Sequence, residues 1–144
     1  MKKLLFILFV LFTFSPVSNF AQERGTDNNN NTQKWIRIDE LKLQFVLKKL
    51  ALPSNTQEKF TPLYKEYQSE LRAIYSQRKK LREQNKANPE KQVDTDFSFE
   101  SKILDIKQNY KKKFQAILSP EQLNDMYSAE REFRQELMQQ LKRN

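Results

Sequence analysis

The chain has 144 residues and a formal net charge of +8, and its sequence contains neither cysteine nor histidine. These absences exclude disulfides, cysteine or histidine nucleophiles and the usual ligands of zinc, nickel and copper, so we expect no metal, no cofactor and no enzymatic activity. The single glycine, Gly25, leaves no glycine-rich phosphate loop and argues against turn-rich β-sheet folds.

The first 21 residues have the pattern of a secretory signal peptide. Lys2 and Lys3 give a short basic start, an apolar run extends from Leu4 to Phe14, and Ala21 ends the segment with a small residue. The apolar run is shorter than the roughly 20 residues of a membrane-spanning helix. We therefore predict cleavage after Ala21 and a soluble, periplasmic mature protein without a transmembrane segment. Because we expect the protein to be exported, we expect no nucleic acid as a partner. The basic charge then favours acidic polypeptides or anionic membrane surfaces as partners.

The next segment, residues 22–32, is polar and contains four consecutive asparagines. It predicts a disordered tether, followed by a single helical domain over residues 33–144. The first helix of this domain is expected over about residues 33–50, with apolar side chains on more than half of its circumference. Such a helix is either clamped between two others or presents one apolar stripe to a dimer mate or a client.

A second helix is expected over about residues 54–86, with Ser54 as its cap. Pro62 should kink this helix or mark its true start. A heptad-like, coiled-coil seam is apolar for about four turns and then meets Arg78, with Arg82 on the same face. Two interpretations stay open here. Either the helix extends beyond the core and its arginines reach solvent, or its end carries a mixed basic and apolar groove.

A loop over residues 87–94, ending in a cap at Asp94, should lead into a third helix over about residues 95–118. One face of this helix carries a core seam of aromatic and aliphatic residues. The lysines of its other side form either a solvated face or part of a binding surface. That side consists of two apolar residues and a basic cluster, namely Phe97, Leu104, Lys111 and Lys112.

The fourth helix is expected over about residues 119–142. Ser119 should cap it, and Gln122 lies at the position that completes a capping box. Glu130 and Arg134 stand four residues apart inside the apolar seam of this helix. An ion pair at this place would either lock the register of a partly buried helix or mark a seam that is not fully covered.

The start of the fourth helix also carries a family resemblance, in the segment Leu118, Ser119, Pro120, Glu121 and Gln122. This segment differs from the Leu-Thr-x-x-Gln signature of the Spy/CpxP family by one serine for threonine, which keeps the capping hydroxyl. Residues 52–56 resemble a degraded first copy of the signature. The chain thus resembles periplasmic LTxxQ-motif proteins of Spy/CpxP type, and more closely the short exported proteins labelled sensors of ECF-type sigma factors.

The resemblance implies a four-helix hairpin or bundle of Spy/CpxP type that forms a curved homodimer. It also implies an ATP-independent holding chaperone for unfolded or partly folded proteins, or an envelope-stress binding protein. The alternative is a regulator that binds one extracytoplasmic sensor or anti-sigma factor. Metal-binding members use histidine, which this chain lacks. For the client or partner surface we predict a basic and apolar set, namely Arg78, Lys79, Arg82, Phe97, Leu104, Lys111 and Lys112.

Overall fold

The computed structural model describes residues 26–143, and this part of the chain forms four α-helices and no β-strand. The helices are α1 (Thr26–Leu50), α2 (Ser54–Gln84), α3 (Pro89–Gln115) and α4 (Pro120–Arg143). The all-α prediction is therefore confirmed for the described residues. The predicted signal peptide, residues 1–21, lies outside them.

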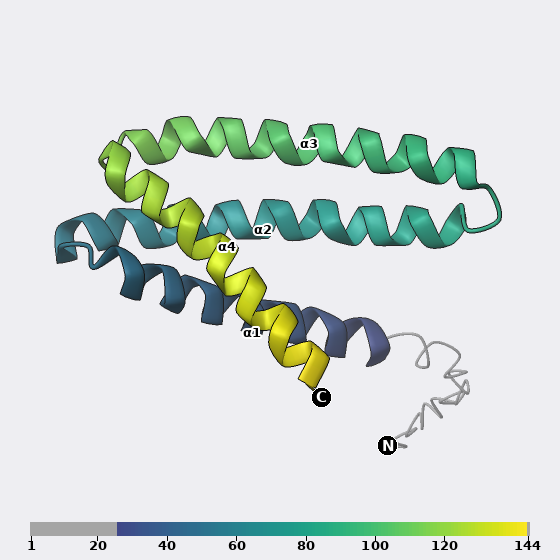
Figure 1. Ribbon diagram of the computed structural model, residues 1–144, viewed down its shortest axis with the longest axis horizontal. Helices are drawn as coiled ribbons and strands as arrows, with labels where there is room; N and C mark the ends of the chain where they lie inside the picture. Colours follow the sequence, from purple (N-terminus) through teal and green to yellow (C-terminus); the bar gives the residue numbers. More distant parts are fainter. Residues whose placement is uncertain (1–25, 144) are drawn as a thin grey trace, which may run out of the picture.

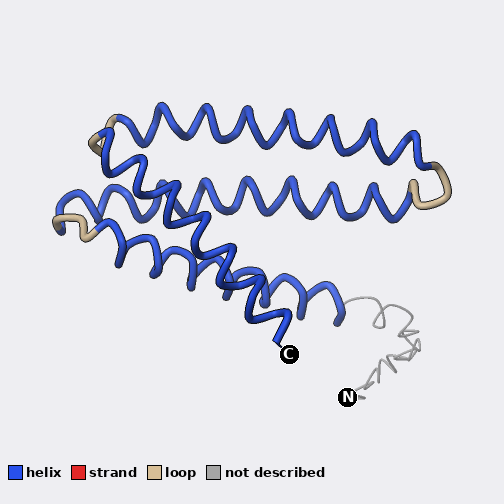
Figure 2. The backbone as a smooth tube through the Cα atoms, in the orientation of Figure 1, coloured by secondary structure: helices blue, strands red, loops and turns tan. Residues whose placement is uncertain are grey.

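The helices α2 and α3 run side by side as a long hairpin (Figure 1). The helices α1 and α4 lie together against the half of this hairpin that is remote from its connecting loop. Both then diverge from the hairpin, so that its other half extends beyond them. We call this other half, residues 75–104, the loop half of the hairpin. Figure 2 shows that short loops connect all four helices.

The first helix is longer than expected. It begins at Thr26, so that residues 26–32, predicted as part of the disordered tether, are helical. Asparagine is a weak helix former, at a cost of less than about 1 kcal/mol per residue. Adding residues to a helix that already exists is far easier than starting one, because the costly nucleus has been formed. The packed part of α1 therefore continues into the asparagine run.

The second helix begins at Ser54 as predicted, but Ser54 is not its cap. Pro53 occupies the cap position and makes no side-chain hydrogen bond there. The first amides are satisfied by the backbone, since the amide of Gln57 donates to the carbonyl of Pro53 at 2.9 Å. The helix continues through Pro62, which therefore does not mark its start.

The third helix begins at Pro89, earlier than the predicted cap at Asp94. The side-chain oxygen of Asn88 accepts a hydrogen bond from the amide of Lys91 at 3.1 Å, and Pro89 takes the first helical position. These two residues suit a helix start. The asparagine side chain satisfies one of the unpaired amides of the first turn, and the proline has no amide hydrogen to satisfy. The helix ends at Gln115, before the predicted residue 118.

The core lies in the half of the hairpin covered by α1 and α4. Its centre is a cluster of five aromatic rings from α2 and α3, whose contacting centroids are 5.2 to 6.2 Å apart. All five rings are fully buried, as their positions in the predicted seams required, and they are Phe60, Tyr64, Tyr67, Tyr110 and Phe114. Rings in such tilted and offset arrangements add to the stabilisation from burial.

The first helix is clamped between two others, one of the two interpretations of its sequence. It contacts both α2 and α4, and its residues Leu43, Val46 and Leu50 are buried. The rings of Phe45 and Phe133 lie 5.8 Å apart at the contact between α1 and α4. Beyond this contact, the N-terminal part of α1 retains exposed apolar side chains.

A buried polar contact joins α4 to α2. The hydroxyl of Tyr64 donates to the carboxylate of Glu130 at 2.8 Å, and both side chains are buried. The predicted pairing of Glu130 with Arg134 is therefore wrong: no ion pair joins these two side chains in the described chain. The apolar seam of α4 places Glu130 against α2, where the Tyr64 hydroxyl donates to it.

The buried tyrosines should make the protein sensitive to alkaline pH. Burial, and then the Glu130 carboxylate, raise the pKa of Tyr64 and of Tyr67 above the usual 10.0. The unfolded chain releases these protons near pH 10 and the folded chain keeps them. Stability is thus fully present below about pH 10 and falls above it, by up to about 1.4 kcal/mol per pH unit for each tyrosine.

Urea unfolding measured at a series of alkaline pH values tests this expectation. The Tyr67→Phe variant should lose stability less steeply than the wild type above about pH 10. Tyr75→Phe is the control, because Tyr75 is about half exposed. Equal slopes for wild type and Tyr67→Phe would contradict the expectation.

Candidate functional site

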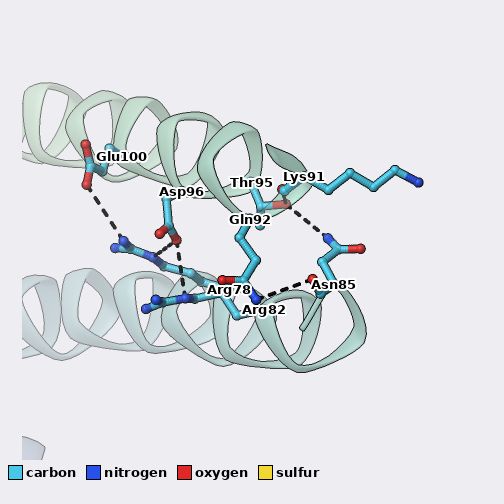
Figure 3. A network of polar contacts seen from close by, with 8 residues as sticks. All are labelled: Arg78, Arg82, Asn85, Lys91, Gln92, Thr95, Asp96 and Glu100. Atoms are coloured by element: carbon cyan, nitrogen blue, oxygen red, sulfur yellow. Dashed lines mark hydrogen bonds and ion pairs between the residues drawn. The ribbon is translucent and has the colours of Figure 1, made fainter. Parts of the chain in front are cut away.

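The loop half of the hairpin is held by polar contacts. The guanidinium Nε of Arg78 donates to Asp96 Oδ1 at 2.9 Å, and its Nη2 lies 3.7 Å from Glu100 Oε1 (Figure 3). Arg82 reaches the same Asp96 oxygen, with its Nε at 3.7 Å. Since the side chains of Arg78 and Asp96 are partly buried, this contact fastens α2 to α3 beyond the part of the hairpin that α1 and α4 cover.

Neutral side chains complete this connection next to the loop. The side-chain amide of Asn85 donates to Thr95 Oγ1 at 3.2 Å, and Gln92 Nε2 donates to the carbonyl of Asn85 at 3.3 Å. Thr95 Oγ1 donates in turn to the carbonyl of Lys91 at 2.6 Å. The end of the hairpin is therefore ordered by hydrogen bonds, although it buries little apolar surface.

A surface hollow of about 520 Å³ lies beside this network. It is lined by Tyr75, Arg78, Lys79, Arg82, Glu83, Lys86 and Gln92. Three of these residues, Tyr75, Lys79 and Arg82, recur on one face of α2 at helical spacing, and Lys86 lies in the turn that follows the end of α2. We call these four residues the basic row. The predicted site did not include four of the lining residues, namely Tyr75, Glu83, Lys86 and Gln92, although the four-and-three spacing of the row was readable.

The basic row continues the face of α2 that contacts α1. Gln68 and Arg72 precede Tyr75 at the same four-and-three spacing. Gln68 Nε2 donates to the carbonyl of Asp39 in α1 at 3.0 Å, and Arg72 pairs with the Asp39 carboxylate. One face of α2 thus packs against a helix in its first half and is open in its second half.

The apolar residues predicted for the site lie beside the basic row. Phe97 and Leu104 flank Glu100 by three and four residues, so all three share one side of α3. Because Glu100 meets Arg78, that side adjoins the basic row. Phe97 and Leu104 are 67% and 54% exposed. Of the seven predicted site residues, Arg78, Lys79 and Arg82 line the hollow, whereas Phe97 and Leu104 lie on the adjoining side of α3 and outside the lining.

The other two predicted residues lie elsewhere. Lys111 and Lys112 are exposed near the far end of α3, about 22 Å along the helix from Asp96 at 1.5 Å per residue. The neighbouring Lys113 is engaged with Glu66 of α2 at 3.4 Å. The basic cluster of α3 is therefore separate from the hollow. Helical periodicity shows the face on which these lysines lie, but not how far along the hairpin they are from Arg78.

The faces of α1 and α4 that contact α2 stay apolar where these helices diverge. Ile36 lies three residues before Asp39, on the side of α1 that meets Arg72, and it is 45% exposed. In α4, Leu141 follows Glu130 by eleven residues on the face that meets α2, and it is 58% exposed. Figure 1 shows both segments leaving the hairpin. The apolar side of α1 at Ile36 and that of α4 at Leu141 are therefore not covered by α2.

The family-like motif is a complete capping box. The amide of Ser119 donates to Gln122 Oε1 at 3.0 Å, and the amide of Gln122 donates to Ser119 Oγ at 3.2 Å. Leu118 and Leu123 are both buried in the core on either side of this turn, which is the hydrophobic-staple arrangement. The predicted cap is confirmed, and the motif has a structural role at the start of α4.

Replacing Ser119 by alanine should lower the free energy of unfolding by about 1 kcal/mol, because the hydroxyl cap is lost. Ser119→Thr is the matched control and should melt close to the wild type, since it keeps the hydroxyl. Thermal or urea unfolding of the three proteins measures the difference. Coincident melts of Ser119→Ala and wild type would show that the bond to Gln122 contributes nothing.

Replacing Arg78 by glutamate should lower the stability of the fold by about 1 kcal/mol or more. The variant would place a third carboxylate beside Asp96 and Glu100, where a cation now joins α2 and α3. Hydrogen exchange of the loop half should increase more than that of the aromatic core. If the variant exchanges like the wild type there, Arg78 does not fasten the hairpin.

Within residues 26–143, none of the helices has a stretch long and apolar enough to cross a membrane. Comparisons with protein-family models, with curated proteins and with solved structures found no match for this chain.

Proposed function

We propose that this chain is an exported, periplasmic, ATP-independent holding chaperone or envelope-stress binding protein of Spy/CpxP type. The observation that carries the proposal is the open side of the loop half. There Lys79 and Lys86, which have no ion-pair partner in the described part of the chain, lie on the side of the hairpin that exposes Phe97 and Leu104. Its ligands are unfolded or partly folded proteins.

The proposed mechanism has two steps. The cations of the basic row attract acidic segments of a client, at a rate that falls as salt screens the charges. Exposed apolar and aromatic side chains, including Tyr75 and Phe97, then hold apolar client surface that would otherwise aggregate. Neither step consumes a cofactor.

A curved homodimer belongs to the same proposal. Trp35 and Leu41 of α1 are more than half exposed, and a second copy could cover such apolar area. The long α2–α3 hairpin supports this reading, because the Spy/CpxP resemblance implies a helical hairpin. Light scattering of the mature protein at tens of micromolar should report twice the chain mass. A monomer at that concentration would remove the dimer from the proposal.

An aggregation assay tests the proposed function. The purified mature protein should suppress light scattering of at least two unrelated aggregating clients without nucleotide, and less strongly at high salt. An unrelated protein of similar size and basic charge is the control. Suppression by the control to the same degree would show a general charge effect and would sink the chaperone proposal.

The second candidate is a regulator that binds one extracytoplasmic sensor or anti-sigma factor. It is favoured by the fixed geometry of the hollow, since Asp96 orients both Arg78 and Arg82 beside it. A regulator would suppress aggregation poorly and would show one saturable partner. The aggregation assay therefore separates the two candidates.

A further inference from the structure

We propose that the basic row binds an amphipathic α-helix of a partner protein, with acidic residues along one side of that helix and apolar residues along the other. The acidic side would face the basic row, and the apolar side would face the diverging ends of α1 and α4. This inference rests on the proposed function, because it names the class of polypeptide that the site takes.

The protein itself packs a helix on the first half of the same face of α2. Gln68 and Arg72 contact α1 there, and the basic row follows them without a change of register. From Tyr75 to Arg82 the row follows α2 for about two helical turns, roughly 10 Å, and Lys86 continues it in the turn after the helix. The open half therefore offers a second surface of the same orientation for a helix.

The charges of the row define the side of the ligand that meets it. Lys79, Arg82 and Lys86 are cations, whereas Glu83 is the one carboxylate that lines the hollow. Asp96 engages Arg78 at 2.9 Å and Arg82 at 3.7 Å, so the cations of the hollow that have no ion-pair partner in the described chain are Lys79 and Lys86. A run of carboxylates at spacings of three and four residues complements this arrangement, and a basic or neutral segment does not.

The opposite side of the ligand is defined by α1 and α4. Ile36 precedes the contact of Asp39 with α2 by three residues and is about half exposed. Leu141 extends the α2-facing side of α4 in the same way. Apolar residues on the second side of a bound helix would cover these side chains.

A helix suits this place better than an extended segment. A helix satisfies its own backbone hydrogen bonds, whereas a strand needs a sheet edge, and residues 26–143 contain no strand. Side chains at spacings of three and four residues also match those of another helix.

Fluorescence anisotropy with labelled synthetic peptides tests the inference. One peptide of about 15 residues, which as a helix is long enough to span the row, aligns glutamates on one side and leucines on the other. A second peptide has the same composition in an order that aligns neither. We expect the first peptide to bind at least about tenfold more tightly, with one peptide per chain at saturation, because only it matches charge and apolar surface together.

A pair of charge-matched variants locates the site. Lys79→Glu with Lys86→Glu should weaken binding of the first peptide at least about tenfold. The control, Lys80→Glu with Lys91→Glu, changes the net charge equally near the same loop but outside the residues that line the hollow, and should leave binding nearly unchanged. None of these four lysine side chains forms an ion pair in the described structure, so circular dichroism should report unchanged folding.

Four results would overturn the inference. Equal binding of the two peptides would show that the site does not distinguish aligned from unaligned glutamates and leucines. An equal loss of binding in the two variants would show unspecific charge attraction. Peptide binding that weakens as the protein concentration rises would mean that a second copy occupies the face. Suppression of client aggregation without peptide binding would keep the proposed function and reject this inference, so the two can fail separately.

Discussion

Replacing Phe114 by alanine should lower the free energy of unfolding by about 3–5 kcal/mol, the usual cost of truncating a buried aromatic side chain. Phe114 is 0% exposed, and its ring contacts the rings of Phe60, Tyr64, Tyr67 and Tyr110. The variant would leave a cavity at the point where α2 and α3 are held together. Urea unfolding followed by circular dichroism measures the loss.

Phe97→Ala is the matched control for this experiment, since it makes the same chemical change on the same helix. Phe97 is largely exposed and lies in the loop half, so its loss should change stability by no more than about 0.5 kcal/mol. It should weaken client capture instead. Comparable destabilisation by the two substitutions would mean that the aromatic cluster does not dominate the stability of the hairpin.

Two of the core tyrosines, Tyr64 and Tyr67, should respond differently when their hydroxyls are removed. Tyr64→Phe should destabilise the protein by about 1–3 kcal/mol, because the buried Glu130 carboxylate loses its hydrogen-bond donor. Tyr67→Phe should be neutral or stabilising by up to about 1 kcal/mol. The Tyr67 hydroxyl is buried and has no hydrogen-bond partner in the described part of the chain.

Both variants keep the ring and its packing, so the comparison isolates the hydroxyl groups. Thermal and urea unfolding at pH 7 should place the wild type between them, or level with Tyr67→Phe. The double variant should show nearly additive effects unless Glu130 turns to Tyr67 when Tyr64 cannot donate. Destabilisation by Tyr67→Phe as large as that by Tyr64→Phe would show that the Tyr67 hydroxyl has a partner in solution.

The two halves of the hairpin have different sources of stability, and this bears on the proposed function. The half covered by α1 and α4 is held by five buried rings, whereas the loop half buries only Phe99 and Ile103 and is otherwise held by Arg78, Asp96 and neutral hydrogen bonds. Segments with few buried apolar contacts open at lower free energy than a core. The proposed binding surface therefore lies on the less stable half, where side chains can adjust to a ligand.

Local signals in the sequence determined the helices and most of the core. Ser119 and Gln122 sit at the spacing of a capping box, and that box forms because it needs only neighbouring residues. The aromatic seam of α2 and α3 was readable because burial follows helical periodicity. The start of α3 was missed because Asp94 and Asn88 are both plausible caps, and the asparagine followed by proline prevails in the structure.

Tertiary structure alone decided which residues meet across the helices. Arg78 interrupts an apolar seam, and nothing in its spacing indicates that Asp96 would bind it rather than a client or Glu130. The basic row became a binding candidate only because α1 and α4 leave α2 before reaching it, which depends on the angle at which the helices cross. Periodicity shows which side of a helix is apolar, whereas the crossing angle decides how far along the helix that side is covered.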